Sequence, residues 1–119
     1  MKKIVKNAVL VDKDINKVGD IKIEDGKIVE IGENLSFDDS YEVIDAKGKT
    51  VMPAFVDLHV HFRDPGFTYK EDLKTGSLSA LRGGYTTVNT MANTKPICSN
   101  LETYNDIMNR ARELNLVDI

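Results

Sequence analysis

The first fifty residues alternate apolar and polar positions in short runs, a pattern typical of β-strands. Residues 9–11 are apolar, residues 20–31 alternate around Asp25-Gly26, and Val43-Ile44 is a further short run. Because the type I′ turn of a hairpin needs positive φ at both central residues, Asp-Gly between two alternating runs predicts a β-hairpin. No helical period precedes Pro53. We therefore predict an all-β segment, arranged as a meander.

After Pro53 the pattern changes. Residues 54–61 form a largely apolar run, as expected of a strand covered on both faces. Thr68 and Glu71 have the spacing of a capping box, which predicts that a helix begins there, and Gly83-Gly84 can supply the left-handed residue that ends it. One face of this helix is small or apolar: Leu73, Gly76, Ser77, Ala80 and Leu81.

The same order of elements then repeats. Residues 86–91 are rich in β-branched side chains and predict a second strand. Ser99 and Glu102 have the spacing of another capping box, ahead of a second helix. Residues 116–119 would begin a third strand. The expected buried stripe of the second helix consists of Leu101, Tyr104, Met108, Ala111 and Leu114.

Strands and helices that alternate with short loops are typical of parallel α/β folds. A (β/α)8 (TIM) barrel needs ~250 residues, so residues 53–119 would supply only its first two βα units and the beginning of a third strand. We predict an α/β chain with an N-terminal β segment at residues 1–52, and interpret it as the N-terminal piece of a longer protein. Uncovered strand edges and apolar helix faces predict that the isolated chain is at least dimeric.

The net charge, the cysteine count and the length of the apolar runs exclude several classes of protein. The 119 residues carry 16 basic and 19 acidic side chains, and the net charge of −3 gives no basic surface for nucleic acid. The single cysteine, Cys98, excludes an intramolecular disulfide. The longest apolar stretch, residues 51–56, is far shorter than the ~20 residues of a membrane span. We therefore expect a soluble protein of the reducing cytoplasm.

The only two histidines, His59 and His61, lie two residues apart on the first predicted strand after Pro53. Side chains at that spacing point to one face of a strand, so the two imidazoles can converge on a metal ion. Asp57 would share that face and could orient a ligand. The alternative is a pair of strand histidines with ordinary hydrogen bonds. Because zinc usually takes at least three protein ligands, two histidines are only part of a site.

Two further polar residues follow the predicted strands. Arg63 lies at the mouth of the first strand, where a guanidinium can hold a carboxylate through two parallel hydrogen bonds. Asn93 lies just past the second strand, and its amide could donate to a carboxylate or a carbonyl oxygen. Both could equally be ordinary loop residues. Asp64-Pro65-Gly66 is interpreted as a turn, and Cys98, with no histidine nearby in sequence, as a bystander thiol.

Four motifs change this interpretation. They are DAKGKTVMP at residues 45–53, HVHFRDPG at 59–66, EDLKTGS at 71–77 followed by AxxGGYTT at 80–87, and MANTKP at 91–96. With these motifs the chain resembles dihydroorotases of the amidohydrolase superfamily, in the long-chain bacterial type. The resemblance covers essentially the whole chain.

The resemblance implies roles for specific residues. His59 and His61 match the family's first-strand zinc ligands, and Arg63 and Asn93 match the residues that bind the substrate carboxylate. The implied reaction is the reversible cyclisation of N-carbamoyl-L-aspartate to L-dihydroorotate and water in pyrimidine synthesis. In the hydrolytic direction a zinc-activated water would attack the ring amide. The bridging carboxylate, the later histidines and the proton-transferring aspartate would lie beyond Ile119. We therefore expect no catalytic base within this chain, and no activity from the chain alone.

Two alternatives stay open. Allantoinases and hydantoinases share the first-strand His-x-His, but a neutral ring gives no reason for a carboxylate clamp at Arg63. A non-catalytic scaffold subunit of aspartate transcarbamoylase is the other alternative, although such subunits tend to lose the metal histidines. The resemblance also implies a small-molecule substrate, a homo-oligomer, and aspartate transcarbamoylase as a candidate partner. For the N-terminal segment it implies part of a small β-sandwich domain.

Overall fold

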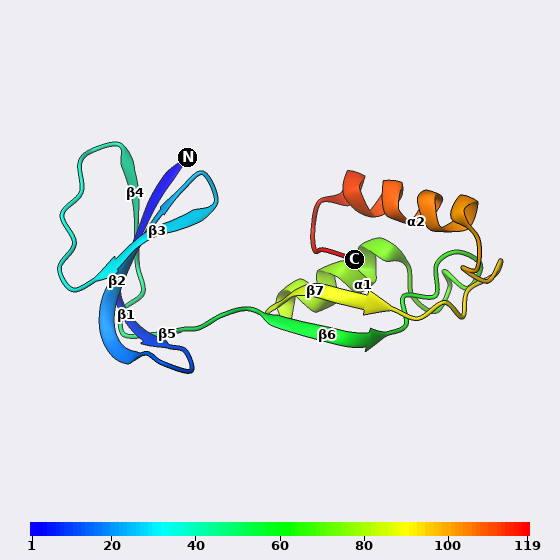
Figure 1. The fold of residues 1–119 in the computed structure, drawn as a ribbon, viewed down its shortest axis with the longest axis horizontal. Helices are drawn as coiled ribbons and strands as arrows, with labels where there is room; N and C mark the ends of the chain where they lie inside the picture. The colour runs from blue at the N-terminus through cyan, green and yellow to red at the C-terminus, as the bar shows by residue number, and fades with distance from the viewer. The chain divides into compact units, whose positions relative to one another are not determined.

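The computed structural model describes residues 1–119 and divides the chain into two units, Met1–Pro53 and Ala54–Ile119 (Figure 1). No helix in either unit combines the length and the apolar character that crossing a bilayer requires. The chemistry-bearing residues named above all belong to the second unit, so the first is described only briefly.

The first unit is a single sheet. Its strands are β1 (Lys2–Val11), β2 (Asn16–Glu24), β3 (Lys27–Gly32), β4 (Tyr41–Asp45) and β5 (Thr50–Val51). Their order is β3-β2-β1-β4, and β5 also pairs with β1. The predicted hairpin is confirmed, because β2 and β3 are antiparallel and Asp25 and Gly26 have φ values of 48° and 78°.

The meander prediction is wrong after β3. Both β4 and β5 pair with β1 in parallel, on the side of β1 opposite β2. The physical reason is the connection: residues 33–40 form a segment long enough to carry the chain back past β1, whereas a tight turn would have placed β4 antiparallel to β3. The expectation that this half of the chain holds no helix is confirmed.

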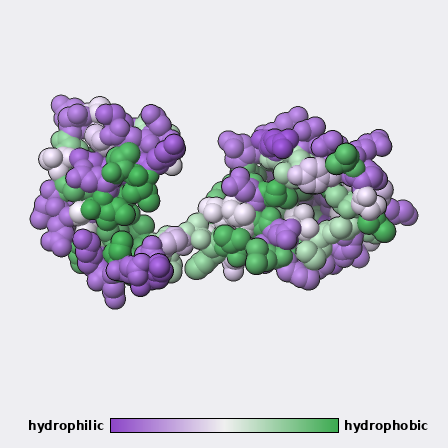
Figure 2. Space-filling model, viewed as in Figure 1, coloured by the Kyte–Doolittle hydropathy of each residue, from purple (hydrophilic) through white to green (hydrophobic).

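The core of the first unit is formed by Ala8, Leu10, Ile21 and Ala46. One buried carboxylate lies in the same unit: Asp20 accepts hydrogen bonds from the backbone N–H groups of Asn7 and Leu35. Figure 2 shows hydrophobic side chains gathered on one face of this unit. An apolar groove of about 220 Å³ in the same unit is lined by residues including Leu10, Ile15, Ile21, Ile28, Ile31 and Met52.

The second unit contains β6 (Phe55–Val60), α1 (Leu73–Arg82), β7 (Tyr85–Thr90) and α2 (Leu101–Leu114). β6 and β7 pair in parallel, and Asp118 forms a parallel bridge with Thr87, where the third strand was predicted to begin. One core joins the strands to both helices: Phe62, Leu73, Val88 and Ile107 are buried together. This strand-helix order agrees with the predicted α/β class.

Several details of the predicted elements are corrected. α1 begins at Leu73, with Asp72 and not Thr68 as the N-cap: the Asp72 carboxylate accepts from Thr75 N at 2.7 Å. Thr68 cannot act as the cap because it lies within a turn closed by the bond from Lys70 N to Phe67 O, whereas Asp72 has the extended backbone that a cap requires. The predicted end of α1 is confirmed, since Gly84 follows it with φ of +85°.

The second helix also begins one residue later than predicted. Asn100, not Ser99, is its N-cap and accepts from Thr103 N at 2.9 Å. The buried face consists of Thr103, Ile107 and Ala111, so the predicted stripe is wrong at Leu101 and Tyr104, which are 77% and 48% exposed. Leu81 of α1 is likewise exposed. β6 is not covered on both faces either, because Leu58 is 72% exposed.

Candidate functional site

The two histidines lie together at the carboxyl end of β6. His59 is on the strand and His61 directly follows it, and their Nε2 atoms are 3.3 Å apart. The rings meet edge to face, with centroids 5.1 Å apart. The structure therefore brings together the pair that the strand period places on one face.

The spacing of the two Nε2 atoms fits a shared metal ion. Two imidazole nitrogens bound to one tetrahedral zinc at about 2.0–2.1 Å each would lie about 3.3–3.4 Å apart. The observed 3.3 Å matches this separation. No group of three or more His, Cys, Asp or Glu side chains gathers anywhere in the chain, so these two ligands have no third partner among the 119 residues.

Asn93 contacts the second histidine. Its Oδ1 lies 3.0 Å from Nδ1 of His61. Because an amide oxygen can only accept, this contact assigns the ring proton to Nδ1 and leaves the lone pair of a neutral His61 on Nε2, the atom that faces His59. The two donors of the Asn93 amide nitrogen are not used in this contact.

Asp57 does not orient an imidazole. Its carboxylate accepts instead from the backbone N–H of His59 at 3.0 Å. The pairing of β6 with β7 shifts register between Asp57 and Val60, and this irregularity interrupts the alternation from which a common face was predicted. Asp57 and His61 line one cavity together with Ser79 of α1 and Gly83, which follows this helix, but no hydrogen bond joins the Asp57 carboxylate to the imidazole.

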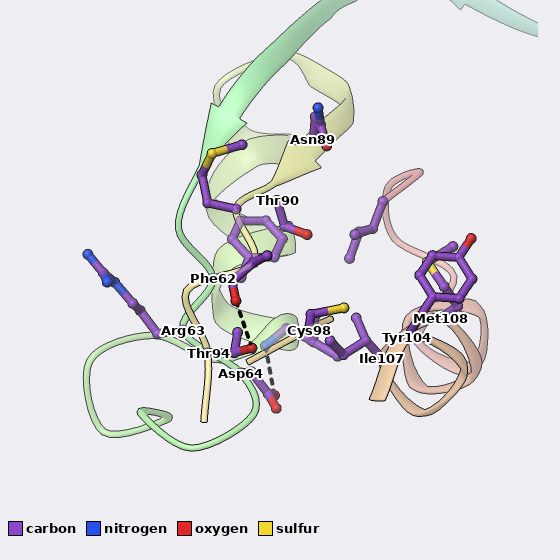
Figure 3. Close-up of a pocket in the computed structure, with 14 residues that line it drawn as sticks. Phe62, Arg63, Asp64, Asn89, Thr90, Thr94, Cys98, Tyr104, Ile107 and Met108 are labelled. Atoms are coloured by element: carbon purple, nitrogen blue, oxygen red, sulfur yellow. Dashed lines mark hydrogen bonds between the residues drawn. The ribbon is translucent and has the colours of Figure 1, made fainter. Parts of the chain in front are cut away.

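Arg63 lies in the loop that follows β6 and adopts a left-handed backbone conformation, with φ of 59°. A non-glycine residue in this region costs roughly 1–2 kcal/mol, so the surrounding loop must hold it there. The Arg63 carbonyl accepts from Phe67 N at 2.9 Å, while its guanidinium makes no hydrogen bond or ion pair within the chain. Figure 3 shows this guanidinium pointing away from the apolar residues around it.

The loops that carry Arg63 and Asn93 are joined to each other. Lys95 N donates to Pro65 O at 2.9 Å. Gly66 lies against the same lysine: its φ is +97°, and a Cβ there would lie 2.2 Å from the Lys95 carbonyl oxygen. The two peptide bonds that precede Pro65 and Pro96 are cis. The loops after β6 and β7 are therefore bonded to each other, and together they form a rim at the carboxyl ends of these two strands.

An ion pair that the sequence pattern did not indicate supports this rim. Asp64, read from the sequence as a turn residue, is only 8% exposed, and its Oδ1 accepts from Arg110 Nη1 of α2 at 2.8 Å. Burial lowers the pKa of Arg110, but the hydrogen bonds from its guanidinium to Asp64 and Asp106 outweigh burial and raise this pKa above its usual value. The two partners are 46 residues apart, so no local motif could have revealed the pair.

A cavity of about 210 Å³ lies between the end of β7 and α2 (Figure 3). Phe62, Ile107 and Met108 contribute apolar surface, and the Cys98 side chain also reaches it. Neither histidine lines this cavity, so it is separate from the candidate metal site.

Comparison with known proteins identifies the family. Residues 48–119 match the family model described as dihydro-orotase-like. The chain belongs to the dihydro-orotase-like family. The dihydroorotase of Clostridium botulinum is 50% identical over all 119 residues, and that of Aquifex aeolicus is 45% identical over 118. The chain spans 30% and 28% of the lengths of these two curated relatives.

Solved structures similar to this member of the dihydro-orotase-like family include hydantoinases. The L-hydantoinase of Arthrobacter aurescens matches 92% of the chain with a TM-score of 0.83 and 36% identity, over 24% of its own length. A molinate hydrolase matches 98% of the chain with a TM-score of 0.70, and at 24% identity this match concerns the fold alone. The chain therefore shares its mixed α/β arrangement with part of each of these two solved structures.

Proposed function

We propose that the full-length protein is a dihydroorotase, which interconverts L-dihydroorotate and N-carbamoyl-L-aspartate in pyrimidine synthesis. The observation that carries this proposal is the pair of His59 and His61 Nε2 atoms, 3.3 Å apart, followed two residues later by a free guanidinium at Arg63. The identity of 50% to a curated dihydroorotase supports the same reaction.

His59 and His61 would hold a zinc ion through Nε2, and residues beyond the 119 described here would complete its ligand set. When bound, the metal supplies a Lewis acid and lowers the pKa of a water towards neutrality, which allows attack on a ring amide at physiological pH. Asn93 holds the proton of His61 on Nδ1 and so keeps Nε2 free as a ligand. A carboxylate outside this chain would transfer the proton in the reaction.

Arg63 would bind the carboxylate of the substrate. Its guanidinium makes no ion pair within the chain, and its planar fork matches a carboxylate through two parallel hydrogen bonds. The amide nitrogen of Asn93 would add a further donor, since the contact with His61 uses only the oxygen. The Arg63 guanidinium and the Asn93 amide nitrogen, both on this rim, would hold the substrate ring so that its amide faces the histidines.

A hydantoinase is the second candidate, because the L-hydantoinase of Arthrobacter aurescens matches the chain with a TM-score of 0.83. A hydantoin ring carries no carboxylate, so it would leave Arg63 without a partner at the site. The curated relatives at 45–50% identity are dihydroorotases, which favours the first candidate. A scaffold role without catalysis is disfavoured because both histidines are present.

The proposal extends to architecture and assembly. Ala54–Ile119 would begin a (β/α)8 barrel, with the histidines at the carboxyl end of its first strand, and Met1–Pro53 would form part of a small β-sandwich domain. Apolar side chains that are exposed in this chain, such as Leu58 and Leu101, would be covered by the rest of the protein or by a second copy. We propose a cytoplasmic homo-oligomer, with aspartate transcarbamoylase as a candidate partner.

The experiment that tests the function is a substrate comparison with the full-length protein. The purified enzyme, with its zinc content measured, is assayed with L-dihydroorotate, hydantoin and allantoin under identical conditions. We expect kcat/KM to be highest for dihydroorotate by at least about tenfold, because only that ring offers a carboxylate to Arg63. A preference for hydantoin would replace the proposal with the second candidate, and no turnover of any ring would favour the scaffold role.

A further inference from the structure

Asp64 connects the loop that carries Arg63 to both helices of its unit. One carboxylate oxygen, Oδ1, accepts from Arg110 Nη1 at 2.8 Å. The other, Oδ2, accepts from the backbone N–H of Leu73, the first residue of α1, at 3.3 Å. Asp64 is 8% exposed, and its bond to Leu73 N is buried, whereas its bond to the half-buried Arg110 side chain is partly open to water.

Arg110 is itself held in place from the other side. Its Nε and Nη2 donate to Oδ2 of Asp106, one helical turn earlier on α2, at 3.1 and 2.8 Å. With three of its donors engaged, the guanidinium has one defined orientation. The Arg110 guanidinium therefore bridges the buried Asp64 carboxylate and the exposed Asp106 carboxylate.

The position of Asp64 bears directly on Arg63, because the two residues share a peptide bond. Arg63 has φ of 59°, which an arginine keeps only when its neighbours are constrained. On the N-terminal side the chain is fixed by buried Phe62. On the C-terminal side it is fixed by the bond from Phe67 N to the Arg63 carbonyl, by the side chain of Asp64, and by the bond from Lys95 N to Pro65 O. Asp64 is the residue bonded to Arg63, and its side chain is what connects this part of the loop to both helices.

We propose that Arg110, acting through Asp64, is a positioning residue for Arg63, and that it thereby sets the affinity of the site for a substrate carboxylate. This inference rests on the proposed function. The Arg110 side chain forms hydrogen bonds only with Asp64 and Asp106, and with neither histidine. Its role is to keep the Arg63 backbone in the conformation that presents the guanidinium at the rim.

The test uses the full-length enzyme with Arg110→Met, which keeps most of the side-chain volume and removes all donors. We expect KM for L-dihydroorotate to rise about tenfold while kcat stays within about twofold of the wild-type value. A merely structural defect behaves differently: a partly unfolded population lowers the apparent kcat and leaves KM unchanged. Arg112→Met is the matched control, since Arg112 lies on the same helix and its side chain donates only to Asn109, so its KM should not change.

Arg110→Gln provides a second variant if Arg110→Met does not fold, because glutamine keeps a donor but loses the charge; we expect a rise in KM there as well. An unchanged KM in a folded Arg110 variant, in an enzyme whose wild type turns over dihydroorotate, would overturn the positioning role and leave the proposed function intact. Failure of the wild type to turn over dihydroorotate would instead refute the proposed function. An equal rise in KM in Arg112→Met would also overturn the inference.

Discussion

The side-chain oxygen of Asn93 lies 3.0 Å from Nδ1 of His61 and joins the loop after β7 to the end of β6. The resemblance to dihydroorotases assigns Asn93 to the substrate, whereas this contact places its oxygen on a candidate metal ligand. The two roles are compatible because they use different ends of the same amide. The oxygen orients the imidazole, and the nitrogen remains available to an anion.

Replacement of Asn93 should therefore affect both metal and substrate. In Asn93→Ala the Nδ1–H of His61 loses its acceptor, and the loss of such a partner typically weakens metal binding by about 10–100-fold. We expect a lower zinc affinity, measured by competition with a chelator, together with a higher KM for dihydroorotate at saturating zinc. A higher KM with unchanged zinc affinity would leave only the substrate role.

Removal of either histidine should reduce bound metal and turnover together. In His59→Ala or His61→Ala one of the two Nε2 atoms is lost, and zinc usually needs at least three protein ligands. The measurements are the zinc content of the purified full-length variants by elemental analysis and their kcat with dihydroorotate. Circular dichroism on the same samples establishes that the fold is retained. Full metal occupancy in both variants would remove the ligand assignment.

The pair of histidines could be predicted from the sequence because their convergence depends only on the two-residue period of a strand. The hairpin at Asp25-Gly26 was predictable for a similar reason, since the turn is decided by two adjacent residues. The helix starts were each misplaced, because Asp72 and Asn100 act as caps through an extended backbone that residue identities alone do not reveal. Local rules therefore succeeded where residue identity alone decides the geometry, and failed where the backbone conformation decides which of several possible residues caps a helix.

Relationships between distant segments were not predictable. The bond between Asp64 and Arg110 spans 46 residues. The local sequence, an aspartate before a proline, indicates only a turn, because the partner lies on α2. The parallel pairing of β4 with β1 depends in the same way on the path of residues 33–40. The prediction that Asp57 orients a metal ligand is wrong, because the register shift in β6 cannot be recognised from an alternating sequence pattern.

Substitution of Arg63 by lysine should weaken substrate binding without abolishing the chemistry. An ammonium keeps the charge but loses the planar fork that makes two parallel hydrogen bonds to a carboxylate. We expect KM for dihydroorotate to rise about tenfold or more, with a smaller change in kcat, in steady-state kinetics of the full-length enzyme. An unchanged KM would mean that the carboxylate is held elsewhere.

Gly66→Ala should separate the two rim loops. An alanine Cβ would lie 2.2 Å from the carbonyl oxygen of Lys95, a backbone atom that cannot move aside cheaply. We expect a loss of about 3 kcal/mol or more in unfolding free energy, from steric overlap added to the unfavourable φ. Gly48→Ala is the control: Gly48 also has positive φ, +76°, but nothing lies within 4 Å, so the loss should be about 1 kcal/mol. Equal losses in denaturant titrations of the two variants would contradict the predicted overlap.

The stability of the first unit should depend on the ionisation of Asp20. This carboxylate is 3% exposed and lies 3.2 Å from the Lys6 ammonium. Burial raises the pKa of Asp20, but hydrogen bonds from Asn7 and Leu35 N–H groups and the contact with Lys6 outweigh burial and hold this pKa below its usual 3.8. A carboxyl group whose pKa is lower in the folded state stabilises the fold above its unfolded pKa, and that stabilisation disappears as the pH falls through the folded pKa.

The difference in thermal midpoint between wild type and Asp20→Asn isolates this effect, because the other carboxyl groups contribute equally to both proteins. We expect the wild type to be more stable between pH 5 and 7. The difference should begin to shrink as the pH falls below about 4, where Asp20 takes up a proton in the unfolded chain, and should disappear once the pH falls through the lowered pKa of the folded state. Asp39→Asn, at an exposed position of the same unit, should match the wild type at every pH. If the difference for Asp20→Asn were independent of pH from 7 down to 2, the stabilisation would come from side-chain shape and not from the charge.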